Sequence, residues 1–212
     1  MDLVEILQKR YSCRSYLKKD VNDEDVKKII DYASLAPSAG NLQPWKVIIV
    51  TNKEKRESLS IACMNQSWMK QAPVYLVICG NEDYIKNFYK AKGELYSKQD
   101  CAAFIQTMLL LATEMGLASC WVGAFEENVV KRELEIPDNL VVYAVITLGY
   151  SNEKNPDSKK RYDSQTFTFF EKYGNRIQNK SILSLADKFP TIQEKNQRAF
   201  NKMKEELLKH SK

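Results

Sequence analysis

The sequence predicts an α+β domain in which a mixed sheet lies against a buried helix. Three apolar segments rich in β-branched residues, 45–50, 73–79 and 140–148, have the length and composition of strands. One long segment, 100–115, carries apolar side chains around most of a helical circumference, which is typical of a buried helix. The chain has 212 residues, enough for one domain with a substantial core.

Helical patterns precede and separate these strands. Residues 2–9 repeat apolar side chains at helical spacing. A second helix begins after Asn22, a favourable N-cap, and has to end before Pro37 because the residue before a proline avoids helical backbone angles. Two further helices are predicted at 54–64 and 129–134.

The remaining segments are less regular. Residues 118–122 form a short strand or a turn, and Gly116 suits the position just after the long helix. The polar and aromatic segment 81–97 has no clear period: it either covers the functional site or is a helical excursion at the surface that packs its own aromatics. Residues 174–212 read as a charged helical C-terminal extension to a domain of residues 1–173.

Charge and hydropathy exclude several classes of protein. The net charge is +5, but the 32 basic and 27 acidic residues are interspersed, whereas a nucleic-acid footprint needs a clustered basic face. No apolar run approaches the roughly 20 residues of a membrane helix, and the acidic start of the chain lacks a signal-peptide pattern. We therefore expect a cytoplasmic protein that binds neither nucleic acid nor membrane.

Cysteine and histidine usage narrows the chemistry. The five cysteines form no Cys-x-x-Cys pair, so a disulfide framework or a zinc site is not expected. The single histidine is His210, almost at the end of the chain, which argues against hydrolases that need an internal catalytic histidine. We expect no metal and no catalytic side chain in the strict sense.

Two basic clusters carry residues suited to phosphate. Arg10, Tyr11, Ser12 and Arg14 follow the first helix, and Lys159 to Arg161 follow the last strand. A guanidinium group matches phosphate oxygens with two parallel hydrogen bonds, and a serine hydroxyl adds a short donor. Each cluster taken alone is also compatible with a solvated surface loop.

Two loops offer groups suited to a planar heterocycle. The loop 37–45 combines backbone donors, the amides of Asn41 and Gln43, and the flat wall of Trp45. Gly123 would let a ligand approach the backbone closely. Ordinary turn chemistry explains the same residues equally well. The chain has neither the Gly-x-Gly-x-x-Gly pattern nor a Walker A motif, so a Rossmann or P-loop phosphate site is not available.

Together these pieces resemble the FMN-dependent nitroreductase family in its small single-domain form. The resemblance covers residues 3–163 and rests on four motifs in the expected order. They are Arg10-x-Ser12-x-Arg14, the loop 36–45, the segment 116–125, and Leu148-Gly149-Tyr150 followed by Lys159-x-Arg161.

The resemblance implies a mainly antiparallel sheet with surrounding helices, an intertwined homodimer, and two FMN sites at the subunit interface. The implied phosphate residues are Arg10, Ser12, Lys159 and Arg161, with Tyr11 in the same motif. Arg14 would approach the pyrimidine side of the isoalloxazine, where it would stabilise the reduced form. Asn65 would reach the ring edge, and Val122 and Gly123 would present their backbone. The partner subunit would supply Pro37, Ser38, Ala39 and Asn41.

The implied activity is reduction of nitroaromatics, quinones or flavins with NADH or NADPH, by alternate reduction and reoxidation of the flavin. An alternative is a flavin-binding redox sensor or store without NAD(P)H turnover, and a weaker one is a basic nucleic-acid-binding module. The chain departs from the common motif at Tyr11 and Cys13. Cys13 lies between two arginines, so it is either a thiol of lowered pKa with a redox role or a packed thiol. The extension 174–212 is expected to pack on the partner subunit.

Overall fold

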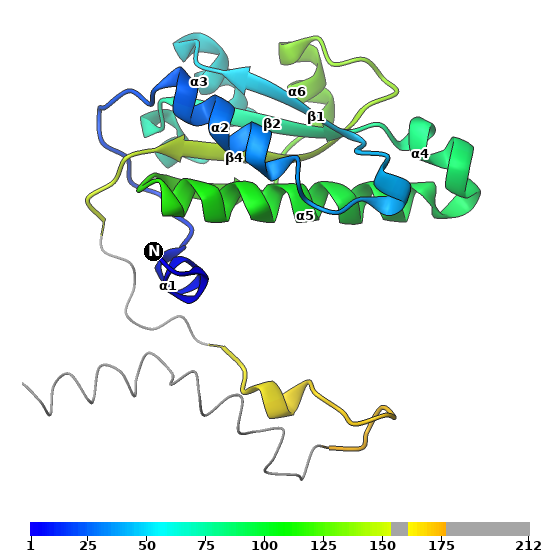
Figure 1. Cartoon of the computed structure of the whole chain (residues 1–212). Coiled ribbons are helices and arrows are strands. Elements are labelled where there is room, and N and C mark those ends of the chain that lie inside the picture. Colours follow the sequence, from blue (N-terminus) through cyan, green and yellow to red (C-terminus); the bar gives the residue numbers. More distant parts are fainter. Residues whose placement is uncertain (154–160, 177–212) are drawn as a thin grey trace, which may run out of the picture. The chain divides into compact units, whose positions relative to one another are not determined.

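A computed structural model describes residues 1–153 and 161–176 (Figure 1). The chain divides into two units, Met1–Pro156 and Asp157–Lys212. The predicted boundary at residue 173 falls within the second unit, and the predicted helical extension lies almost wholly outside the described residues. In the second unit the structure describes a short 3₁₀ turn, η4 (Ser164–Thr166), and an isolated antiparallel bridge between Phe169 and Arg176.

The first unit contains a four-stranded sheet in the order β1-β2-β4-β3. The strands are β1 (Trp45–Val50), β2 (Val74–Gly80), β3 (Ala118–Val122) and β4 (Val141–Gly149). All three strand pairings are antiparallel. The expected mixed sheet is therefore antiparallel in its named strands, and the parallel component among the described residues is an isolated bridge between Ser12 and Ser119.

Two helices cover one face of the sheet, α2 (Asp23–Ala33) and α5 (Gly93–Glu114). Figure 1 shows α5 lying beneath the sheet and running roughly parallel to the strands. Phe104, Ile105 and Met108 of α5 are fully buried there, which confirms the prediction of a buried helix. Asn22 caps α2 by accepting a hydrogen bond from the Glu24 N–H, as expected from its side-chain chemistry.

The other face packs against α3 (Lys53–Ala62), the 3₁₀ helix η2 (Ser67–Gln71) and α6 (Glu127–Leu134). β2 is buried along its whole length because it has core on both faces. The short helix α1 (Leu3–Lys9) precedes the sheet and is capped by Asp2, whose Oδ1 accepts the Glu5 N–H at 2.8 Å. None of the helices in the described part of the chain has both the length and the hydropathy of a membrane-crossing segment.

The segment 81–97 is helical and packs its own aromatics, Tyr84 on Phe88 and Tyr89 on Tyr96, as one of its two interpretations expected. It contains α4 (Glu82–Tyr89), the 3₁₀ turn η3 (Lys90–Lys92) and the first turn of α5, which therefore begins seven residues earlier than predicted. Tertiary contacts explain the difference. The Tyr143 hydroxyl donates to the buried Glu82 carboxylate at 2.8 Å and lies 3.1 Å from Ser97 Oγ, so a residue of β4 fixes both helices.

Replacing Gly93 by alanine tests this junction. Alanine normally stabilises a helix by about 1 kcal/mol relative to glycine. Here a Cβ on Gly93 would lie 2.6 Å from the backbone nitrogen of Lys86 and 2.7 Å from its Cα, so backbone has to move. We expect Gly93→Ala to lower the free energy of unfolding by about 1–3 kcal/mol in urea denaturation. A gain in stability would contradict this packing.

Candidate functional site

The segment 10–14 runs alongside β3. Ser12 forms a parallel bridge with Ser119, and the Cys13 N–H donates to the Ser119 carbonyl at 3.0 Å. In a parallel pairing both chains advance in the same direction, by about 3.3 Å per residue. Arg10 therefore lies toward the start of β3, while Arg14 lies toward its end at Val122. The structure thus places the predicted residues Arg10, Ser12 and Arg14 in a row along the edge of the sheet, beside β3.

Arg14 joins this row to the loop after α3. Its guanidinium carbon lies 5.8 Å from the centre of the Trp68 ring, a cation–π contact worth about 0.5–1 kcal/mol at an exposed site. Trp68 lies on η2 and stacks on the buried Tyr16 at 6.5 Å. Asn65 precedes η2, is exposed, and adopts a left-handed backbone angle of 53°. Asn65 stands three residues before Trp68 in the chain.

Sequence reasoning missed Trp68. No spacing argument pointed to it, because Asn65 lies outside η2 and has a left-handed backbone angle.

Arg10, Ser12 and Arg14 all affect the pKa of one buried thiol, that of Cys120. Burial raises the pKa of Cys120, while the charge of Arg14, a hydrogen bond from Ser12 and the charge of Arg10 oppose that shift. Cys120 lies in the middle of β3, beside the segment 10–14. Cys13 is fully buried and its thiol donates to the Ser15 carbonyl at 3.1 Å, which favours the packed thiol over the redox role.

The end of β3 presents open backbone. Val122 is buried in the core, whereas Gly123 is exposed. A Cβ built on Gly123 would meet nothing closer than Trp121 Nε1 at 3.8 Å, so no residue in the described ranges covers that surface. The position can therefore receive a ligand against its backbone.

Gly123→Val separates ligand contact from folding. Because the site is open, we expect the urea midpoint of this variant to stay close to that of the wild-type protein. If a cofactor rests on the Gly123 backbone, the new side chain should lower its affinity by about tenfold or more, measured by fluorescence titration. Unchanged cofactor affinity would contradict the assignment of this surface.

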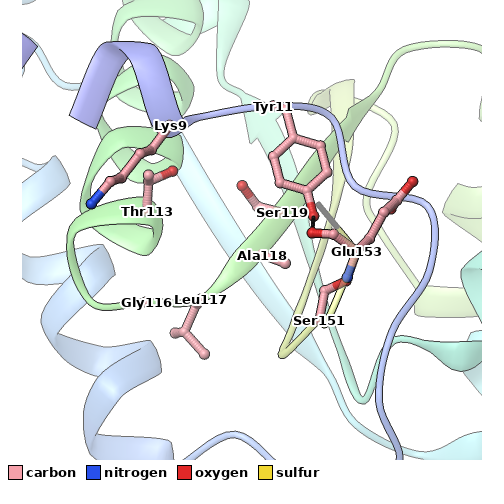
Figure 2. Close-up of a pocket in the computed structure, with 9 residues that line it drawn as sticks. All are labelled: Lys9, Tyr11, Thr113, Gly116, Leu117, Ala118, Ser119, Ser151 and Glu153. Atoms are coloured by element: carbon pink, nitrogen blue, oxygen red, sulfur yellow. Dashed lines mark hydrogen bonds between the residues drawn. The ribbon is translucent and has the colours of Figure 1, made fainter. Parts of the chain in front are cut away.

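The Tyr11 side chain is not part of the row. Its hydroxyl donates to the Glu153 carbonyl at 2.9 Å, and burial raises its pKa to about 12. Figure 2 shows its ring pointing toward Ser151 and Glu153, within a pocket of about 170 Å³ at the end of α5. Glu153 Oε2 also accepts the Arg14 N–H at 3.4 Å. Tyr11 therefore ties the segment 10–14 to the chain that follows β4.

The loop 37–41 lies far from this row in the same chain. It leads into β1, where Trp45 pairs with Gly80 and Gly80 pairs with Val141 at the start of β4. Ser119 instead pairs with Leu148, seven residues or roughly 24 Å further along β4. β1 and β3 are also the opposite edges of the sheet. The structure therefore does not bring Pro37, Ser38, Ala39 and Asn41 to Ser12 within one chain.

This loop is nevertheless firmly shaped. The Ala39 N–H donates to Asp100 Oδ1 of α5 at 3.0 Å, and a Cβ on Gly40 would lie 2.7 Å from the Tyr89 hydroxyl. Gly40, Asn41 and Gln43 have positive φ angles between 48° and 57°. Gly40, Asn41 and Gln43 are also exposed, so this loop is fixed by its own chain and accessible to solvent. Among the other predicted residues, Lys159 lies outside the described residues and Arg161 belongs to the second unit, so their role in phosphate binding stays a prediction.

Comparison with known proteins gives consistent matches. The model of the nitroreductase family matches residues 7–67 and 60–150. A protein of Archaeoglobus fulgidus, named for NADH dehydrogenase and NAD(P)H nitroreductase activities, is 34% identical over 157 residues, 72% of this chain and 87% of the relative. The structure of a nitroreductase family protein from Clostridium difficile 630 superimposes with a TM-score of 0.72 at 33% identity, covering 81% of this chain and 99% of that one. An FMN-dependent nitroreductase from Clostridium difficile R20291 gives 0.68 at 28% identity, covering 80% and 99%.

Proposed function

The chain belongs to the nitroreductase family of oxidoreductases, and we propose that it is an FMN-dependent enzyme. It would take electrons from NADH or NADPH and pass them to nitroaromatics, quinones or flavins. The observation that carries the proposal is the parallel alignment of the segment 10–14 with β3. It sets two cations and a hydroxyl in a line that ends at exposed backbone, and FMN has its phosphate and its ring at opposite ends.

The residues fit the phosphate at one end of this line. Arg10 offers a forked donor and Ser12, which is exposed, offers a hydroxyl. The sequence pattern predicts two further cations here, Lys159 and Arg161. We assign Tyr11 a supporting role, because its hydroxyl is engaged with Glu153.

The residues also fit the ring at the other end. Arg14 would stabilise the negative charge that reduction places on the pyrimidine edge, and Trp68 would hold its guanidinium in place. Asn65 would bond the ring edge, and the open backbone at Gly123 would receive the ring face. Bound FMN supplies the hydride chemistry itself, so the protein needs no acid–base side chain.

In this proposal the loop 37–41 comes from a second copy of the chain. Within one chain it lies roughly 24 Å along the sheet from Ser12 and at the opposite edge. A homodimer with two sites at its interface would place the loop of each chain over the segment 10–14 of the other. This agrees with a loop that is shaped by its own chain yet faces outward.

An absorption spectrum of the purified protein, followed by anaerobic titration with NADH and NADPH, tests the function. We expect a flavin spectrum with about one FMN per chain, which either nucleotide or both bleach and a quinone restores. Protein that binds FMN but is not bleached would be a flavin store or sensor and would overturn the enzymatic proposal. Protein that stays colourless with excess FMN would overturn the cofactor assignment as well.

A further inference from the structure

A second cavity, of about 600 Å³, opens where β2 begins. It lies between the segment 16–20 and the end of η2, and neither the family motifs nor the proposed flavin contacts include it. Four cationic side chains line it with a single carboxylate, that of Asp20; the cations are Lys18, Lys19, Arg56 and Lys70. Within the described part of the chain none of these four forms a salt bridge.

Arg56 is oriented in this cavity without being neutralised. Its Nε donates to the Thr51 carbonyl at 3.1 Å, and its Nη1 donates to the Ala72 carbonyl at 2.5 Å and to that of Lys70 at 3.4 Å. These partners are neutral, so the guanidinium keeps its full charge. Nη2 makes no hydrogen bond to any described residue, which leaves one end of the fork for a ligand.

The lysines add charge around this fixed group. The Lys19 ammonium lies 3.7 Å from the centre of the Tyr150 ring, which holds it in place without cancelling its charge. Lys18 and Lys70 are exposed. Gathering four like charges around one cavity is unfavourable unless an anion relieves the repulsion. Phosphate oxygens match both the guanidinium fork and the ammonium groups.

The cavity adjoins the proposed flavin site. Tyr16 lines the cavity and stacks on Trp68, which also carries Arg14 against its ring. Gln71, another lining residue, accepts the Tyr16 N–H at 3.0 Å. The stacked rings of Tyr16 and Trp68 therefore connect this cavity with the proposed flavin site.

We propose that this cavity binds a diphosphate group. Two sources share that chemistry, a nicotinamide dinucleotide that donates electrons and a free polyphosphate. The assignment to the dinucleotide rests on the proposed function, whereas the diphosphate site itself does not.

Calorimetric titration of the FMN-loaded protein with inorganic pyrophosphate at low salt tests the site. We expect saturable binding that Lys18→Glu and Lys70→Glu each weaken by about tenfold. Lys27→Glu is the matched control, because Lys27 is an exposed lysine of α2 outside the cavity and its replacement changes the net charge equally. Absence of saturable binding by the wild-type protein, or an equal loss in Lys27→Glu, would overturn the proposal.

Steady-state kinetics distinguish the two sources. A KM for NADH or NADPH that rises about tenfold in Lys70→Glu, at unchanged kcat and FMN content, assigns the site to the dinucleotide. An unchanged KM together with weakened pyrophosphate binding assigns it to a free polyphosphate. Protein that binds no flavin would defeat the proposed function alone, because the same pyrophosphate titration, carried out without FMN on the wild-type protein and the three variants, still decides whether this cavity binds diphosphate.

Discussion

Co-expression of an Arg14→Glu chain with an Ala39→Trp chain should yield a heterodimer that holds one FMN, although neither variant alone holds any. Arg14 faces the proposed ring edge beside Trp68, and charge reversal there should weaken FMN binding by about 100-fold or more. Ala39 belongs to the loop 37–41, and in the proposed dimer an indole ring there would enter the space assigned to the cofactor of the partner chain. In a homodimer of the first variant both sites lack Arg14, and in a homodimer of the second variant both sites carry the altered loop.

The recovery of FMN binding in the heterodimer depends on which chain supplies Arg14 and which supplies the loop 37–41 to each site. If the loop acts on the partner, one site of the heterodimer collects both substitutions and the other collects neither. The purified heterodimer, selected through two different tags, should therefore contain about half the flavin of the wild-type dimer, measured by absorption. If each chain built its own site, both sites would be damaged and no flavin would return.

A charge control completes this experiment. Arg132→Glu changes the same charge at an exposed position of α6, away from the segment 10–14. It should retain full flavin content in either combination. A heterodimer without flavin, formed from two variants that unfold in urea at the wild-type midpoint, would contradict the shared site.

The parts of the fold that the sequence predicted correctly are those governed by local chemistry. Asn22 caps α2 through its own side chain, and the β-branched residues of β1 and β4 lie in the strands that their pattern indicated. Gly116 adopts a φ of 74° after α5, where a residue without a Cβ was expected. In each case the deciding atoms lie within a few residues of one another.

The parts that it did not predict depend on distant contacts. α5 begins at Gly93 because that residue packs against Lys86 and because Ser97 meets Tyr143 of β4. The Tyr11 side chain turns away from the row because its hydroxyl meets a carbonyl 142 residues later in the chain. The cavity lined by Lys18 and Lys70 likewise joins segments that are far apart in sequence. No periodicity or motif reports such pairings.

The stability of the fold is expected to fall steeply as the pH rises above about 9. Burial raises the pKa of the Cys63 and Cys101 thiols to about 12 and that of Cys79 to about 11, from an ordinary value of 9.0. The unfolded chain loses these protons near pH 9, whereas the folded chain keeps them. The unfolded state therefore binds fewer protons in this range, and rising pH favours it.

The pH range and the size of the stability loss follow from these raised thiol pKa values. Stabilisation by the neutral thiols is complete below the unfolded pKa, near 9, and is lost as the pH approaches the folded values of about 11 and 12. Each thiol contributes roughly 1.4 kcal/mol per pH unit, so the three together remove several kcal/mol by pH 11. Burial raises the pKa of the Tyr16 hydroxyl above its ordinary value of 10.0 as well, which adds to the loss from about pH 10 upward.

Urea unfolding between pH 7 and 11, in the presence of a reducing agent, measures this loss, and Cys101→Ala identifies its source. The variant removes one ionising group from the core that α5 forms with the sheet. It should be less stable than the wild-type protein at pH 7, because a small cavity replaces the thiol, yet lose stability less steeply above pH 9. Parallel curves for the two proteins would show that Cys101 does not control the alkaline loss, since a cavity alone lowers stability by the same amount at every pH.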